Sequence, residues 1–187
     1  MASRIFSFLD ELQHDLFREK LAAIEPKYFE LCSGLAGKNE ADRIQSIELA
    51  DYQETLRSAL NKAISLADDS SKAIYFEYDL DNDWKSCFYL CNQYNTLEEE
   101  DEDWASEWEK HVEGPSHIEF AEIYAEYGFD RSEAAIGNTL YLVARTVVAL
   151  ASVCQTVESH LPISIAFHDQ DPIMRIRTTV FHKREVL

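Results

Sequence analysis

Apolar residues recur every three or four positions through the N-terminal third of the chain, a spacing that predicts amphipathic helices. The first run extends from Ile5 to Phe17. Pro26 either ends this helix or opens a second one, because proline has no amide hydrogen to continue the helical ladder. Asn39 can cap a further helix that reaches about Ala67. We therefore expect residues 5–67 to be mainly helical.

Two later segments also show helical spacing. Residues 116–127 form a short predicted helix that Gly128 closes. Residues 131–159 are apolar around most of the helix circumference, which is typical of a buried helix. We expect this segment to be the long central helix of the fold, with Arg145 either at an edge or paired.

The apolar period changes to two in two regions, which predicts strands. Residues 73–94 alternate on both sides of an aspartate-rich turn, and residues 162–182 alternate around a turn that contains Pro172. Each region is predicted to be a hairpin. The resulting prediction is a single α+β domain over residues 1–187, with helices packed on an antiparallel sheet built from the two hairpins.

Composition agrees with one soluble domain. The chain has 187 residues, 46% of them apolar, which is enough for one well-packed core. Its longest apolar run, Thr139–Val153, is interrupted by Arg145 and is too short to span a bilayer. No secretory signal pattern begins the chain, and its four cysteines form no CxxC pair. We expect a cytoplasmic protein with reduced thiols.

The negative charge is concentrated in the middle of the chain. The formal net charge is −18, and residues 68–130 hold 19 acidic and 3 basic residues, a net of −16. Residues 1–67 contribute −3 and residues 131–187 contribute +1. Such a charge disfavours nucleic acid and anionic membrane surfaces as partners. It favours a basic protein partner.

The strongest local signal is the acidic segment 98–113, which holds nine carboxylates together with Trp104 and Trp108. We expect a surface loop or short helix, in which the two tryptophans, four residues apart, share one face. Carboxylates there would steer a basic partner and aromatic rings would anchor it. The candidate partner-binding residues are Asp79, Asp81, Asp83, Trp84, Glu98, Glu99, Glu100, Asp101, Glu102, Asp103, Trp104, Glu107 and Trp108. The alternative is a solvated acidic loop beside two core tryptophans.

Metal and catalytic motifs are weak. The Asp79-x-Asp81-x-Asp83 pattern lacks the glycine and the final glutamate of an EF-hand loop and fits a hairpin turn. The chain has no GxSxG, GxGxxG, P-loop or HExxH motif, and we predict no cofactor. A metal-dependent or hydrolytic enzyme remains an alternative, through a C-terminal group made of His160, His168, His182, Asp169 and Asp171.

An acidic α+β protein with the dipeptides Asp83-Trp84, Asp103-Trp104 and Glu107-Trp108 after an aromatic hairpin resembles the immunity proteins of bacterial polymorphic-toxin and contact-dependent systems. The resemblance covers general character and residues 74–113, and it assigns no residue role. It implies a non-enzymatic protein that binds a cognate toxin and blocks its active site or its entry path. Because closely spaced carboxylates resemble the phosphates of nucleic acid, a nuclease is one natural target. A scaffold subunit, whose acidic loop only maintains solubility, is a further alternative.

Overall fold

The computed structural model of the protein describes residues 4–99 and 101–176. Within these ranges the chain forms one α+β domain, as predicted. Its α-helices are α1 (Arg4–Arg18), α2 (Leu21–Leu35), α3 (Lys38–Gln45), α4 (Ala50–Leu66), α5 (Ile118–Tyr127) and α6 (Glu133–Cys154). Its strands are β1 (Ala73–Tyr78), β2 (Ser86–Cys91), β3 (Trp108–Glu113), β4 (Ile163–Phe167) and β5 (Met174–Ile176), and two 3-10 helices are η1 (Leu97–Glu99) and η2 (Asp103–Ser106).

The sheet is mixed, so the predicted antiparallel sheet made of two hairpins is wrong in its topology. Both hairpins form in the described chain, as β1–β2 and β4–β5, and residues 177–182 of the second prediction lie outside the described residues. The two hairpins join through β1 and β4, which run parallel. A third strand pairs with the first hairpin, because β3 lies antiparallel to β2. The strand order is β3-β2-β1-β4-β5. Parallel neighbours need a long crossover, and here the chain between β1 and β4 supplies it.

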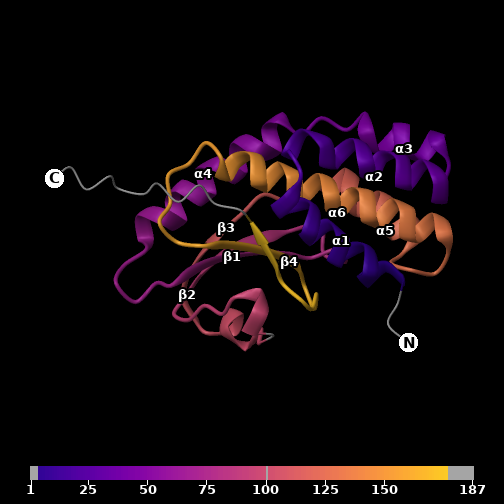
Figure 1. Cartoon of the computed structure of the whole chain (residues 1–187). Coiled ribbons are helices and arrows are strands. Elements are labelled where there is room, and N and C mark those ends of the chain that lie inside the picture. The colour runs from indigo at the N-terminus through magenta and orange to yellow at the C-terminus, as the bar shows by residue number, and fades with distance from the viewer. Residues whose placement is uncertain (1–3, 100, 177–187) are drawn as a thin grey trace.

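The six α-helices of the described chain lie on one side of the sheet (Figure 1). The central element of this layer is α6, which is buried along nearly its whole length, as its composition predicted. It packs most extensively against α2. By length and composition α6 could cross a membrane, but 89% of its apolar window is buried inside the protein. Such burial is typical of the core helix of a soluble protein.

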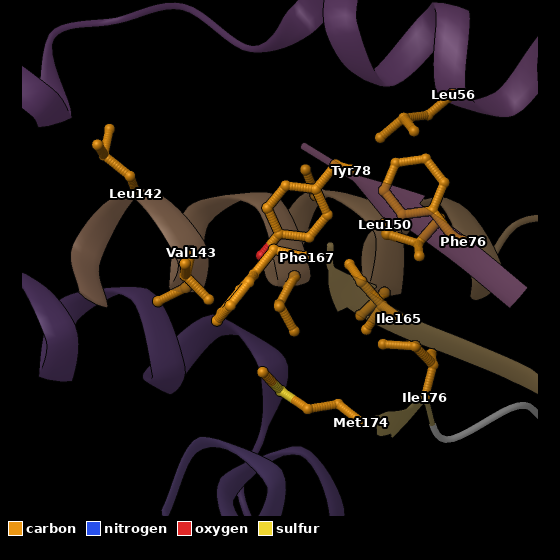
Figure 2. Close-up of a cluster of buried hydrophobic side chains, with 14 of the residues drawn as sticks. Leu56, Phe76, Tyr78, Leu142, Val143, Leu150, Ile165, Phe167, Met174 and Ile176 are labelled. Carbon is orange, nitrogen blue, oxygen red and sulfur yellow. The ribbon is translucent and has the colours of Figure 1, made fainter. Parts of the chain in front are cut away.

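The main core fills the space between α6 and the sheet. Figure 2 shows Tyr78 of β1 and Phe167 of β4 beside Val143 of α6, and the rings of Tyr78 and Phe167 meet edge to face at 6.3 Å. Alternation along β1 turns Ile74, Phe76 and Tyr78 toward this core and leaves Tyr75 and Glu77 on the other side of the sheet. The alternation of side chains along each strand therefore determines which residues lie on the face of the sheet that points away from the main core.

Three helix boundaries differ from the sequence prediction. The helix expected between Asn39 and Ala67 is broken at residues 46–49 into α3 and α4. Pro26 lies inside α2, and the preceding break falls before Leu21. Ser132 caps α6, with its side chain accepting the amide of Ala135. These differences do not alter which helix faces reach the core.

Arg145, the charged residue inside α6, is paired rather than free. Its Nε donates to Glu25 Oε1 at 2.9 Å, and Nη1 donates to the carbonyl of Ile44. The guanidinium also lies over the ring of Phe120, 5.8 Å from the centroid. A buried cation is tolerated when its donors are satisfied, which explains a charge inside the most apolar helix.

Candidate functional site

The face of the sheet that points away from the α-helices is called the outer face. Among the described residues, no α-helix covers it. Residues 92–99 and 101–107, which contain η1 and η2 and which we call the insertion, lie on this side, opposite the α-helices (Figure 1). Across three strands the outer face carries one row made of Glu113, Cys87 and Glu77 and a second made of His111, Tyr89 and Tyr75. The insertion covers only part of these rows, so a candidate site can form beside it.

The acidic segment does not form the single helix that would place both tryptophans on one face. Trp104 belongs to η2 and is 1% exposed, whereas Trp108 begins β3 and is 41% exposed. Trp104 packs against Tyr75 and Tyr94, with ring centroids at 6.1 and 5.3 Å. It is the centre of a small second core between the insertion and the sheet. For Trp104 the alternative of a core residue beneath an acidic loop is therefore correct.

Arg175 of β5 holds the insertion against the outer face. Its guanidinium lies over the rings of Trp104 and Tyr94, 5.0 and 5.6 Å from their centroids. Nη1 and Nη2 each reach Glu102 Oε2 at 3.2 Å, and Nη2 also donates to the carbonyl of Asn95 at 2.8 Å. Trp104 Nε1 donates to the same Glu102 oxygen at 3.1 Å. Glu102 is therefore committed to an internal ion pair and is not a free docking charge.

An open groove of about 510 Å³ lies beside the insertion. Three separate parts of the chain contribute its carboxylates, because Glu77 comes from β1, Asp103 from η2, and Asp169 with Asp171 from the β4–β5 turn. The complete lining is Tyr75, Glu77, Tyr89, Glu102, Asp103, Ala105, Ser106, Trp108, Asp169, Gln170, Asp171 and Ile173. A concave, strongly acidic surface of this kind suits a cationic group.

The groove also has an aromatic wall. The rings of Tyr89 and Trp108 are 4.8 Å apart, and Tyr89 stacks on Tyr75 at 6.0 Å. Trp108 is among the few large apolar side chains that are exposed in the described chain. Aromatic rings bind cationic groups through their negative faces and give large contact area. The groove therefore combines long-range attraction for a cation with a surface that could hold it.

His168 is the titratable base at the edge of the groove. Its Nδ1 is 3.4 Å from Glu77 Oε1, and its Nε2 is 3.7 Å from Asp169 Oδ1. Partial burial opposes protonation, but the two carboxylates outweigh it and raise the pKa of His168 above its usual 6.5. Tyr75 donates its hydroxyl hydrogen bond to Glu77 Oε2 at 3.0 Å, and burial with that carboxylate raises the pKa of Tyr75. Glu77 is thus held in place from both sides.

The aspartates of the first hairpin do not line the groove. Asp79, Asp81 and Asp83 form the β1–β2 turn, as predicted, with Asp79 Oδ1 accepting the amide of Asp81. The insertion begins at the opposite end of β2, and the six residues of this strand separate its two ends by about 17 Å. Trp84 is fully buried, and its Nε1 donates to Thr146 Oγ1 at 3.1 Å. None of these four residues lines the groove.

The remaining predicted residues fall into two groups. Glu98, Glu99, Asp101 and Glu107 are exposed on the insertion but do not line the groove. Glu100 lies outside the described residues. Asp103 and Trp108 are the members of the predicted set that combine exposure with a place in the groove. The structure thus separates a broad acidic segment into a supporting part and a part that faces the site.

The alternative metal site is not assembled in the described part of the chain, where no three His, Cys, Asp or Glu side chains converge as metal ligands. His168 and Asp169 are neighbours, but the groove that contains Asp169 and Asp171 is not lined by His160. His182 lies outside the described residues.

Cys87 and Cys91 are on one strand and are free thiols, and burial raises the pKa of each.

The predicted partner-binding set left out the aromatic and acidic groove residues Tyr75, Glu77, Tyr89, Asp169 and Asp171, of which Asp169 and Asp171 were predicted only as part of the alternative metal or catalytic group. The available signal was the alternation in residues 73–94, which shows aromatic or small residues on both faces. Such a pattern is typical of strands that are buried on both faces. A partly exposed aromatic face produces the same pattern, since tyrosine suits both environments.

No protein-family model, curated protein or solved structure matches this chain. The function must therefore be argued from the geometry of the site.

Proposed function

We propose that the protein is a non-enzymatic binding protein that takes a basic surface of a partner protein into the acidic groove on its outer face. One observation carries this proposal. The carboxylates of Glu77, Asp103, Asp169 and Asp171 converge from three segments around an aromatic wall that includes exposed Trp108. Carboxylates that are distant in the sequence surround one groove. Acidic residues that served only to keep the protein soluble would not have to gather around a groove.

Within this class, the more specific proposal is an immunity protein of the bacterial cytoplasm that neutralises a cognate toxin. The acidic groove supports it because a toxin that acts on nucleic acid has a basic substrate site, and closely spaced carboxylates compete with phosphates for such a site. The aromatic wall would supply the buried anchor that a tight complex needs. The protein would block access without making or breaking a bond.

The charge distribution predicts how the complex forms. Opposite charges steer the encounter of two proteins and can raise the association rate from about 10⁵–10⁶ to about 10⁸–10⁹ M⁻¹s⁻¹ at low salt. Salt screens this attraction over about 8 Å at physiological ionic strength. Association with the partner should therefore slow steeply as salt rises, while dissociation depends more on the contacts around Trp108.

The test compares two variants of equal net charge. The groove variant carries Asp103→Asn, Asp169→Asn and Asp171→Asn, all at exposed positions. Asparagine suits position 169, whose φ of 64° lies in the left-handed region. The control variant removes three charges outside the groove, through Asp81→Asn, Glu119→Gln and Glu122→Gln, which are also exposed.

Each tagged protein is used to capture partners from a lysate of the source cell at low and at high salt, and bound proteins are identified by mass spectrometry. A stoichiometric basic protein should be recovered by the wild type and by the control variant, and much less by the groove variant. Its association rate should fall about tenfold or more with the groove variant. Equal recovery with both variants would show that the groove is not the binding site. Recovery of no specific partner would favour the scaffold alternative.

A further inference from the structure

The outer edge of β3 is an unpaired sheet edge that borders the proposed site. β3 is the first strand of the order β3-β2-β1-β4-β5, and it pairs with β2 on one side. No other strand of the described chain pairs with it. Proteins usually protect such an edge, because its free amides and carbonyls can accept another strand. Here a bulge disturbs the β2–β3 register at the Trp108 end of β3, and residues 110–113 remain regular.

The free backbone groups of this edge can be assigned from the register. The amide of Gly114 donates to the carbonyl of Ser86 at 2.9 Å, so Gly114 points toward β2. In an antiparallel pair, residues alternate between pointing toward the partner strand and away from it. Val112 and Lys110 therefore also point toward β2, whereas the amides and carbonyls of His111 and Glu113 point away from the sheet. Together these two residues offer two donors and two acceptors.

A second groove, of about 450 Å³, runs along the inner side of this edge. Its walls are His111, Val112 and Glu113 of β3 and four residues of α4, which are Thr55, Ser58, Ala59 and Lys62. An added strand would turn alternate side chains toward this space and the others toward the outer face. There is therefore room for both rows of side chains of a sixth strand.

The charges decide which strand can occupy the edge. On the outer face Glu113 is the carboxylate directly beside an added strand, whereas Glu77 lies two strands further into the sheet, so the nearest side chain of the added strand meets the Glu113 carboxylate. A second copy of this chain fits poorly. Self-pairing centred on His111 would bring Glu109 of one copy opposite Glu113 of the other, and each copy carries a net charge of −18. Opposite charges across a strand pair stabilise it, and like charges destabilise it.

We propose that β3 accepts an extended basic segment of the partner protein as a sixth strand, with lysine or arginine side chains on the outer face. This inference rests on the proposed function, because it assigns the mode by which the basic partner is held. The backbone of His111 and Glu113 would bind the added strand, and its basic side chains would meet Glu113 and approach the acidic groove.

The test uses a short acetylated peptide that alternates lysine and valine, and two N-methylated forms of it. In an added strand that is antiparallel to β3 and has lysines on the outer face, the lysine amides point toward β3 and the valine amides point to solvent. N-methylation of the lysine amides should weaken binding about tenfold or more, because it removes the hydrogen bonds to the edge. N-methylation of the valine amides leaves those bonds and the charge intact, so this control should bind almost like the parent peptide.

A pair of protein variants tests the same contact from the other side. His111→Pro removes the outward amide and leaves the bonds between β2 and β3, whereas His111→Ala keeps both. Peptide binding, measured by isothermal titration calorimetry, should weaken about fivefold or more for His111→Pro and little for His111→Ala. Amide hydrogen exchange at Glu113 should slow when the peptide binds.

The outcomes separate this inference from the proposed function. If both methylated peptides and both variants bind equally well, the peptide is held by charge alone, and the edge is not the docking site although the groove can be. If the peptide does not bind while the groove-dependent partner is captured, strand addition is refuted and the groove stands. If His111→Pro does not fold, the comparison of the two methylated peptides on the native protein decides.

Discussion

The contact between Arg175 and Glu102 allows the sharpest prediction about stability. The two side chains are 5% and 18% exposed, and Arg175 also lies between two aromatic rings. Glu102→Ala would leave the guanidinium buried without its carboxylate. It would also remove the acceptor of the Trp104 indole N–H.

The expected magnitude follows from these contacts. Removing one partner of a buried ion pair costs about 3–5 kcal/mol, because the remaining charge is desolvated and unpaired. For a chain of this size, that loss lowers the melting temperature by about 6–20 °C. The effect should extend beyond the insertion, since Gln13 of α1 binds the backbone of Arg175 through its amide, with Nε2 donating to the carbonyl at 3.1 Å.

The assay is equilibrium unfolding in urea, followed by circular dichroism and by tryptophan fluorescence, which reports on Trp84, Trp104 and Trp108 together. Glu54→Ala is the matched control, because Glu54 pairs with Arg57 on the surface, where the side chains are 74% and 39% exposed. An exposed pair of this kind contributes less than about 1 kcal/mol. The loss for Glu102→Ala should therefore exceed that of the control several-fold.

A double variant checks the mechanism. Glu102→Ala combined with Arg175→Met has no unpaired buried charge, so it should be more stable than Glu102→Ala alone, with a coupling of about 2–3 kcal/mol. Equal losses for Glu102→Ala and Glu54→Ala, or no coupling in the double variant, would refute the argument that Arg175 is a desolvated clamp.

Three further predictions use the same unfolding or binding assays. A Cβ at Gly137 would lie 2.9 Å from a Cβ of α2, so Gly137→Ala should destabilise the fold by about 1–3 kcal/mol, whereas Gly34→Ala, with no atom within 4 Å, should stabilise it by about 0.5–1 kcal/mol. Burial lowers the pKa of His117 below its usual 6.5. The unfolded chain therefore binds this proton first, and stability should fall as pH drops below about 6.5. In the His117→Phe variant, the urea concentration at the midpoint of unfolding should therefore change less between about pH 7 and pH 5 than in the wild type. Trp108→Ala should weaken partner binding about tenfold or more, whereas Trp84→Ala should cost about 3–5 kcal/mol of stability.

The sequence was sufficient to predict helices and strands in which apolar residues recur at a regular spacing over many positions. α6 is an example, because eighteen of its residues are buried and its sequence is apolar on nearly every face. The β1–β2 and β4–β5 hairpins were also predictable, since alternation and turn residues act over short distances. Local preferences and local pairing were sufficient in these cases.

The candidate site was predictable only in outline. The concentration of acidic residues between positions 68 and 130 is a property of the sequence, and Asp103 with Trp108 lies in the groove. Asp169 and Asp171 reach the same groove from a turn that follows β4, far along the chain. Trp104 and Trp108 looked equivalent by spacing, but one fills a small core and the other is exposed.

The sequence by itself determined the fold class, the central buried helix, the hairpins and the excess of negative charge, because each depends on composition or on contacts between near neighbours. Only the tertiary structure decided the parallel pairing of β1 with β4, the burial of Trp84, the clamp of Arg175 on Glu102 and the convergence of carboxylates on the outer face. These features join residues that are far apart in the chain. Packing and the pairing of buried charges determine which of these residues meet, and the local spacing of apolar residues carries no information about such long-range contacts.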